Sequence, residues 1–113
     1  MSQPSHREQI KGRGASKGEA TGRAYYIESI NNIDKIKDGE ILLCRMTSPD
    51  WVPAMRRASA IVTKVGGILC HAAIVSRELG IPCVVAVGSV ISKLDGKVIE
   101  VDGGKGIVRI VAG

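Results

Sequence analysis

A single histidine, His71, stands where its imidazole could carry covalent chemistry. It follows the flexible pair Gly66-Gly67 and precedes a run of helix-forming residues, so we expect it at the N-terminus of a short helix. Backbone N–H groups at that end of a helix lack partners within the helix and favour an anion. A neutral imidazole nitrogen is a nucleophile, and these N–H groups would stabilise a phosphoryl group that it accepts. His71 is therefore the candidate catalytic residue.

Six further residues are expected to support a phosphoryl group on His71. Glycines leave room for the group, N–H groups of the first helical turn stabilise it, and a thiol and a hydroxyl lie near it. The residues predicted to support the phosphate are Gly66, Gly67, Cys70, Ala72, Ala73 and Thr63. Arg77 could also reach the phosphate, although a salt link on the helix surface is the more ordinary role for it.

Other chemistry at these positions has weaker support. A lone histidine can simply end a loop. Three cysteines, Cys44, Cys70 and Cys83, are an odd number without a CxxC pair, which argues against a disulfide framework and for a reducing compartment. A zinc site from Cys70, His71 and Cys83 is feasible in ligand chemistry but lacks a recognised spacing, so we predict no metal site. Adjacent residues such as Cys70 and His71 usually point apart, which disfavours a Cys-His nucleophile pair.

The local pattern predicts the element that holds His71. Val75 and Leu79 lie four residues apart on one face of a helix, Gly80 has the character of a C-terminal cap, and Pro82 prevents continuation. We therefore expect a helix from about residue 71 to 79. An apolar strand at residues 60–63 leads into the glycine pair, and a strand rich in valine at residues 83–87 follows the helix.

The remaining elements are short. Strands are expected at residues 23–28, 40–46, 97–101 and 107–111, the last two joined as a hairpin by Asp102-Gly103-Gly104. A helix should begin at residues 47–50 with a hydroxyl cap and run to about residue 58. Helical turns are expected within residues 31–39 and 89–94. The glycines at 12, 14, 18 and 22 lack the GxxxxGK[ST] order of a nucleotide-binding loop and predict turns. The fold class is α/β, a compact domain of about six short strands with two or three short helices.

Length and composition limit the function classes. The chain has 113 residues, enough for one domain, and we assign residues 1–11 to a flexible lead-in and residues 12–113 to the domain. His6, in the lead-in, is expected to be inert. A net charge of +5 suits anionic partners, but the basic residues are scattered without an aromatic ladder, which argues against nucleic acid. The sequence shows no signal peptide or membrane-spanning run, so we expect a cytoplasmic protein.

The stretch around His71 resembles the mobile phosphohistidine domain of phosphoenolpyruvate-utilising enzymes, which include phosphoenolpyruvate synthase, pyruvate phosphate dikinase and enzyme I of the sugar phosphotransferase system. The matching residues are Gly66-Gly67, Cys70-His71-Ala72-Ala73-Ile74-Val75, Arg77-Glu78 and Gly80-Ile81-Pro82, with weaker agreement at Gly18, Gly22, Thr47-Ser48-Pro49 and Asp102-Gly103-Gly104. The resemblance implies a swivelling β/β/α domain whose histidine, His71 here, is phosphorylated and moves between two distant sites.

This chain departs from the family pattern beside the histidine. Relatives often carry a polar residue and then a threonine after the glycine pair, whereas this chain has Ile68 and Leu69. The resemblance therefore does not by itself imply hydroxyl assistance, or regulation by phosphorylation of that threonine, in this chain. Cys70 looks more like the synthase-type variant of the motif.

The function expected from the residues and the resemblance is that of a phosphoryl carrier in a pyruvate dikinase-like phosphotransferase. The chain shows no acidic cluster for Mg²⁺ and no phosphate-binding loop, so it would bind no cofactor itself and would act as the kinase or transferase domain of a larger enzyme or complex. Mg²⁺ and nucleotide are expected on its partners, a nucleotide-binding and a phosphoenolpyruvate- or pyruvate-binding domain or subunit. Two alternatives stay open: a non-catalytic regulatory or assembly module with the swivel fold, and a small basic domain that binds a ligand or nucleic acid.

Overall fold

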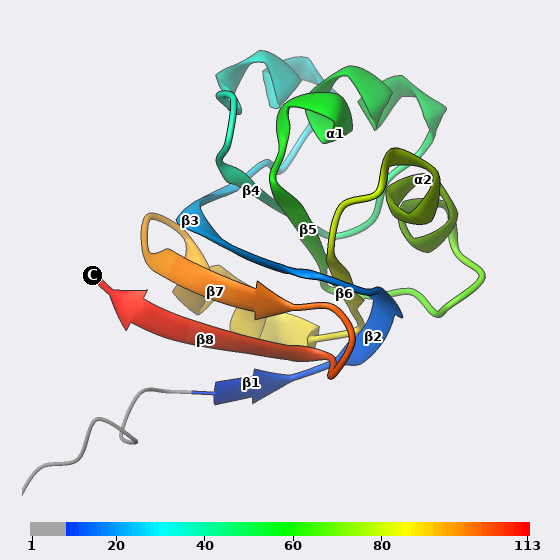
Figure 1. The fold of residues 1–113 in the computed structure, drawn as a ribbon. Helices are drawn as coiled ribbons and strands as arrows, with labels where there is room; N and C mark the ends of the chain where they lie inside the picture. Colours follow the sequence, from blue (N-terminus) through cyan, green and yellow to red (C-terminus); the bar gives the residue numbers. More distant parts are fainter. Residues whose placement is uncertain (1–8) are drawn as a thin grey trace, which may run out of the picture.

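The computed structural model describes residues 9–113 and arranges them around an eight-stranded sheet (Figure 1). The spatial order of the strands is β1-β8-β7-β3-β4-β5-β6-β2. Strands β3 to β6 pair in parallel, and the remaining pairs are antiparallel. The strands are β1 (Gln9–Lys11), β2 (Arg13–Ser16), β3 (Glu19–Tyr26), β4 (Ile41–Cys44), β5 (Ala60–Thr63), β6 (Cys83–Val85), β7 (Val98–Asp102) and β8 (Ile107–Ala112).

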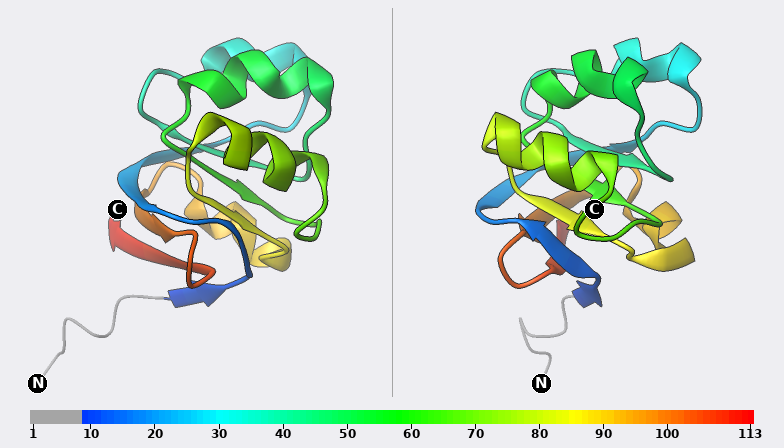
Figure 2. Two further views of the ribbon diagram at one scale, coloured as in Figure 1. Left: turned by 45° about the vertical axis from the view of Figure 1, so that its right-hand side comes forward. Right: turned by 90° about the vertical axis from the view of Figure 1, so that its right-hand side faces the viewer.

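Two hydrophobic cores lie on opposite faces of the parallel strands. Side chains alternate along each strand, so Leu42 and Ile61 face one core while Leu43 and Val62 face the other. This burial on both faces explains why β4, β5 and β6 read as continuous apolar runs. The first core is covered by helices α1 (Val52–Arg57) and α2 (His71–Leu79) with the 3₁₀ helices η2 (Ile30–Lys35) and η3 (Pro49–Trp51). The second is closed by β7, β8 and the 3₁₀ helix η4 (Gly88–Leu94), on the other side of the sheet in Figure 2.

The two ends of the sheet come together around Gly12, because β1 and β2 follow one another in the chain but pair at opposite ends of the strand order. The N–H of Gly12 donates to the Gly106 carbonyl oxygen over 2.8 Å. A Cβ on Gly103 would collide with the carbonyl oxygen of Ser16. Glycine in the β7–β8 turn is thus required by the close approach of β2 and not by the turn alone.

The sequence predicted the middle of the chain well. The compact α/β fold class is confirmed, the strand at residues 60–63 has the expected bounds, and α2 covers residues 71–79 with Gly80 in the left-handed conformation at φ 73°. The expected hairpin joins β7 to β8. None of the helices in residues 9–113 is long and apolar enough to cross a membrane.

The predictions for the N-terminal part were partly wrong. The structure has eight strands, not about six, because residues 13–16, expected to be turns, form β2, and β3 begins at Glu19 instead of residue 23. Residues 9–11, assigned to the lead-in, form β1, while residues 1–8 of that lead-in, His6 included, lie outside the described residues. β1 and β2 hold few apolar residues, and their pairing with β8 and β6 overrides a weak local preference.

Candidate functional site

The site lies where the parallel strands β4 and β5 end. Cys44 and Thr63, the last residues of these strands, are partners across the sheet. The pairing continues past them, since the N–H of Lys64 donates to the Cys44 carbonyl oxygen over 3.0 Å. This places the segment after β4, which includes Thr47, beside residues 64–70, which we call the hinge loop. The hinge loop then delivers the chain to His71 at the start of α2.

His71 is held by a hydroxyl from the neighbouring segment. Its Nδ1 lies 2.8 Å from the Oγ1 of Thr47, a buried residue, and His71 itself is half-buried. Which of the two groups donates depends on the tautomer of the ring. An Nδ1–H that donates to the hydroxyl oxygen selects the tautomer in which Nε2 carries the lone pair of a nucleophile.

The role of Thr47 was missed by the sequence analysis, which expected a hydroxyl to cap the helix that begins there. That expectation was right about the cap position, which a hydroxyl residue occupies, and wrong about a capping hydrogen bond. Ser48 is the N-cap of η3 and makes no side-chain hydrogen bond there, while the Thr47 hydroxyl faces His71. The available signal was a hydroxyl residue that follows a fully apolar strand by three positions. Apolar strands are neighbours in a parallel sheet and end at the same edge, so a residue after one strand can meet residues that follow the next.

A small cavity of about 90 Å³ joins these residues. Of the predicted site residues, Thr63, Gly66, Cys70, His71 and Ala72 line it, whereas Gly67 and Ala73 do not. The other lining residues are Met46, Thr47 and Val65. The N-cap of α2, Cys70, makes no side-chain hydrogen bond to the first turn, so the side chains leave the N–H groups of that turn open to another acceptor. The supporting roles of Gly66, Gly67, Cys70, Ala72, Ala73 and Thr63 stay predictions.

Two of the predicted supporting residues have a structural role of their own. Gly66 has φ 128°, and a Cβ there would lie 2.9 Å from the Cys70 Sγ, so the hinge loop requires glycine at this position. Thr63 is buried, and its hydroxyl donates to the Val65 carbonyl oxygen over 2.7 Å. A phosphate that recruits the Thr63 hydroxyl would have to replace that hydrogen bond.

The three thiols differ in environment. Cys44 and Cys83 are buried in the first core, and burial raises the pKa of Cys44 to about 12 and that of Cys83 to about 11. Cys70 is partly exposed beside His71. Within residues 9–113 no group of three or more histidine, cysteine or acidic side chains is arranged to hold a metal ion.

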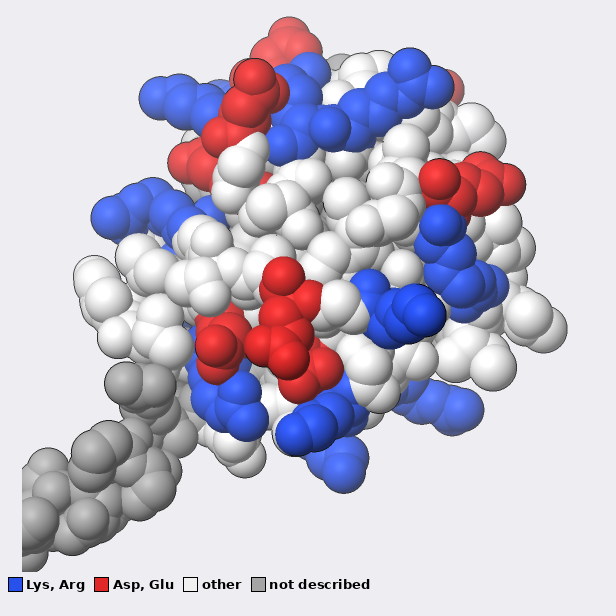
Figure 3. Space-filling model, in the orientation of Figure 1, with Lys and Arg blue, Asp and Glu red and all other residues white. Residues whose placement is uncertain are grey.

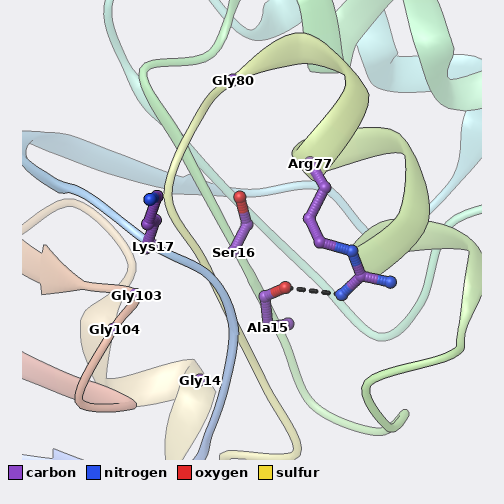
Figure 4. Close-up of a pocket in the computed structure, with 8 residues that line it drawn as sticks. All are labelled: Gly14, Ala15, Ser16, Lys17, Arg77, Gly80, Gly103 and Gly104. Atoms are coloured by element: carbon purple, nitrogen blue, oxygen red, sulfur yellow. Dashed lines mark hydrogen bonds between the residues drawn. The ribbon is translucent and has the colours of Figure 1, made fainter.

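Arg77 links the hinge loop to β2. Its Nη1 donates to the Ala15 carbonyl oxygen over 2.7 Å, and its Nη2 donates to the Ile68 carbonyl oxygen over 2.9 Å. Figure 4 shows the guanidinium turned toward Ala15 at the edge of a hollow of about 560 Å³ between β2, α2 and the β7–β8 turn. The salt link expected for Arg77 is replaced by these two bonds to carbonyl groups.

Acidic and basic side chains are interspersed on the face of the molecule in Figure 3. The net charge of +5 is thus not gathered into one basic patch on this face. A binding surface for nucleic acid is usually such a patch.

The chain is similar to known proteins over most of its length. Residues 36–106 match the family described as "PEP-utilising enzyme, mobile domain", where PEP is phosphoenolpyruvate. A probable phosphoenolpyruvate synthase of Methanothermobacter thermautotrophicus is 55% identical over 100 residues, which cover 88% of this chain and 15% of the relative. This chain therefore spans less than a sixth of the length of that curated relative.

Two solved structures share the fold. An NMR solution structure of Enzyme I (nEIt) has a TM-score of 0.60 and 33% identity, and covers 70% of this chain and 33% of that chain. A crystal structure of holo aconitase X from Thermococcus kodakaraensis has a TM-score of 0.68 at 20% identity, and covers 91% of this chain and 98% of that chain. The second likeness concerns the fold alone.

Proposed function

We propose a phosphoryl-carrier function on the premise that this chain belongs to the mobile-domain family of phosphoenolpyruvate-utilising enzymes. In this proposal His71 accepts a phosphoryl group from a donor site and passes it to an acceptor site. The observation that carries the proposal is the hydrogen bond between Thr47 Oγ1 and His71 Nδ1. In the proposed reactive tautomer Nδ1–H donates to the hydroxyl oxygen, and Nε2 carries the lone pair that accepts the phosphoryl group.

The proposed step balances without a proton acceptor. The Nε2 lone pair attacks phosphorus, the P–N bond forms, and the bond from phosphorus to the donor oxygen breaks with its electron pair. The ring becomes positively charged while Nδ1–H stays bonded to the Thr47 oxygen, which favours that charged state. The same bond fixes the orientation of the ring toward the incoming group.

The donor and acceptor sites in this proposal lie on other domains or subunits. The chain covers 15% of the length of a relative called a probable phosphoenolpyruvate synthase, which leaves most of such an enzyme to supply those sites. We assign them to a nucleotide-binding part that uses Mg²⁺ and to a part that binds phosphoenolpyruvate or pyruvate, as in a cytoplasmic pyruvate dikinase-like kinase. The chain by itself should neither hydrolyse ATP nor turn over phosphoenolpyruvate.

Labelling of His71 tests the proposal. We would treat the chain in two separate reactions. One contains phosphoramidate, a small donor that phosphorylates imidazoles. The other contains an extract of the cells that make the protein, together with ³²P-labelled phosphoenolpyruvate or ATP. A label that is labile in acid and stable in base is expected, because protonation of a phosphoramidate nitrogen makes it a good leaving group. His71→Ala should remove the label, and the matched variant His6→Ala should keep it.

The fold of the variant must be checked beside the label, by circular dichroism and urea unfolding. His71 is half-buried at a helix terminus, so we expect His71→Ala to change the free energy of unfolding by no more than about 1 kcal/mol. Label that persists on a folded His71→Ala protein would refute the assignment. A wild-type chain that the extract never labels would favour the non-catalytic assembly module instead.

A further inference from the structure

Four large hydrophobic residues are exposed to solvent in the part of the chain that the structure describes, and all four lie on the segments that hold or flank His71. They are Leu69, with 79% of its surface exposed, Met46 with 52%, Ile68 with 47% and Ile74 with 42%. We call these four residues the apolar collar. Isolated exposed hydrophobic residues need no explanation, but four that meet at one site mark a contact surface.

Three structural elements bring the apolar collar together. Met46 lines the same cavity as His71. Ile68 and Leu69 belong to the hinge loop, where Arg77 holds the Ile68 carbonyl oxygen. Ile74 lies three residues after His71 on α2 and therefore on the same side of that helix. The four residues thus come from the segment after β4, the hinge loop and the first turns of α2, which are the same segments that hold His71.

Between Lys64, the first residue of the hinge loop, and Arg77 on α2, the chain around His71 carries no formal charge. Residues 65–76 contain no lysine, arginine, aspartate or glutamate, whereas charged side chains of both signs are scattered over the face in Figure 3. At the edge of the collar, Arg45 Nη1 lies 3.3 Å from the Met46 Sδ. Water kept away from the transferring phosphoryl group would strengthen the electrostatic contacts that stabilise it.

We infer that the apolar collar is the docking surface through which this chain seats on the phosphoryl-donor site of another domain or subunit. This inference rests on the proposed carrier function. The partner of the apolar collar would be a binding site with apolar residues at its edge. Basic groups inside that site would supply the positive charge that stabilises the phosphoryl group. The donor must reach Nε2 of His71, so the surface around the donor site must come close to the exposed residues on the segments that hold the imidazole.

The size of the collar favours this occupant over a second copy of the chain. Four side chains bury far less than the about 800 Å² per partner that a stable complex requires. A contact of that size is transient, which a carrier needs because it must leave one site to reach the next. Leu69 is the most exposed of the four and is the expected anchor of the contact.

Labelling by two different phosphoryl donors distinguishes an effect on docking to the donor protein from an effect on the reactivity of His71. Phosphoramidate reaches His71 without a protein surface, whereas the extract with ³²P-labelled phosphoenolpyruvate or ATP phosphorylates it through the cognate donor protein. We would measure the initial rate of labelling of the chain and of Leu69→Gln, Ile74→Gln and Leu69→Met with both donors. Leu69→Met is the matched control, because it keeps an apolar side chain of similar volume at the same position.

The glutamine variants should be labelled about tenfold more slowly by the extract, which corresponds to the loss of one anchor side chain. Their labelling by phosphoramidate, and both rates of Leu69→Met, should stay within about twofold of the wild type. Equal rates of all variants in the extract would overturn the inference. So would a slower reaction of the glutamine variants with phosphoramidate, since the collar would then shape the histidine and not the docking.

Two further outcomes have separate meanings. A concentration-dependent dimer in sedimentation, dissociated by Leu69→Gln, would overturn the inference in favour of a second copy as the occupant. Failure of the extract to label the wild-type chain, while phosphoramidate labels it, would refute the carrier function itself and the docking surface with it.

Discussion

At the scale of single residues, the hydrogen bond between Thr47 and His71 decides what the imidazole can do. The two residues are 24 positions apart in the chain, and their contact exists because β4 and β5 end at the same edge of the sheet. A side-chain partner on one ring nitrogen sets both the tautomer and the orientation of a histidine. Thr47 is therefore a positioning residue in the proposed reaction.

Replacement of Thr47 tests that role. Thr47→Val keeps the shape of the side chain but leaves Nδ1 without its partner, so we expect phosphoramidate to label His71 roughly tenfold more slowly. Thr47→Ser should restore most of the rate, because it returns the hydroxyl. Nitrogen-15 NMR of the imidazole should show a mixture of tautomers in Thr47→Val and one dominant tautomer in the wild type. An unchanged rate and an unchanged tautomer would contradict the role.

At the scale of elements, the hinge loop has a defined position although it has no regular secondary structure. Its N-terminal side is paired with the segment after β4, its glycine at position 66 lets Cys70 approach, and Arg77 holds its Ile68 carbonyl oxygen. The second bond of Arg77, to Ala15, ties the loop and α2 to β2. One side chain thus joins three elements that contribute to the position of His71.

Substitution of Arg77 should loosen the hinge loop. Arg77→Lys keeps the charge but cannot bond two separate carbonyl groups, because an ammonium lacks the planar fork of a guanidinium. We expect a loss of about 1 kcal/mol in the free energy of unfolding, a modest value because the side chain is exposed. Hydrogen exchange at the Cys70 amide, which donates to Gly67, should be faster. Arg56→Lys on α1 is the matched control, and equal behaviour of the two variants would refute the link.

At the scale of the whole molecule, the sheet separates a helix-covered core from a second core closed by β7, β8 and η4. The first core contains the two buried thiols as well as the inner face of α2. Because α2 packs on these strands, the stability of the domain and the position of His71 depend on the same contacts. Conditions that favour the unfolded chain should therefore also disturb the site.

Alkaline pH is such a condition. Burial raises the pKa of Cys44 to about 12 and of Cys83 to about 11, from an ordinary value near 9. Above pH 9 the unfolded chain loses these protons while the folded chain keeps them, so the free energy of unfolding should fall up to pH 11 to 12. The slope is at most about 1.4 kcal/mol per pH unit for each thiol. Urea unfolding from pH 8 to 10.5 measures it, and Cys44→Ala should reduce the slope.

The slope should persist at high salt, because its cause is burial and not a surface charge pair. Stability that does not change between pH 8 and 10.5 would show that the thiols ionise in the folded chain. A Cys44→Ala variant with the full wild-type slope would show that other groups cause the loss.

The sequence by itself determined the elements whose signals are local. A glycine cap, a proline and an apolar pair four residues apart specify α2, and unbroken apolar residues specify β5, because these preferences act over one or two turns of chain. His71 as the candidate and the compact α/β fold follow from the same stretch. Its family resemblance was also visible in those residues.

Only the tertiary structure decided which distant groups meet. β1 and β2 are strands because β8 and β6 offer them hydrogen-bond partners, which their own residues do not indicate. Thr47 reaches His71, and Arg77 reaches Ala15, through the registers of paired strands and the packing of α2. A side-chain hydrogen bond depends on atoms placed within about 3 Å of each other. The order of residues along the chain does not give the distance between two side-chain atoms, because that distance is set only when the sheet forms.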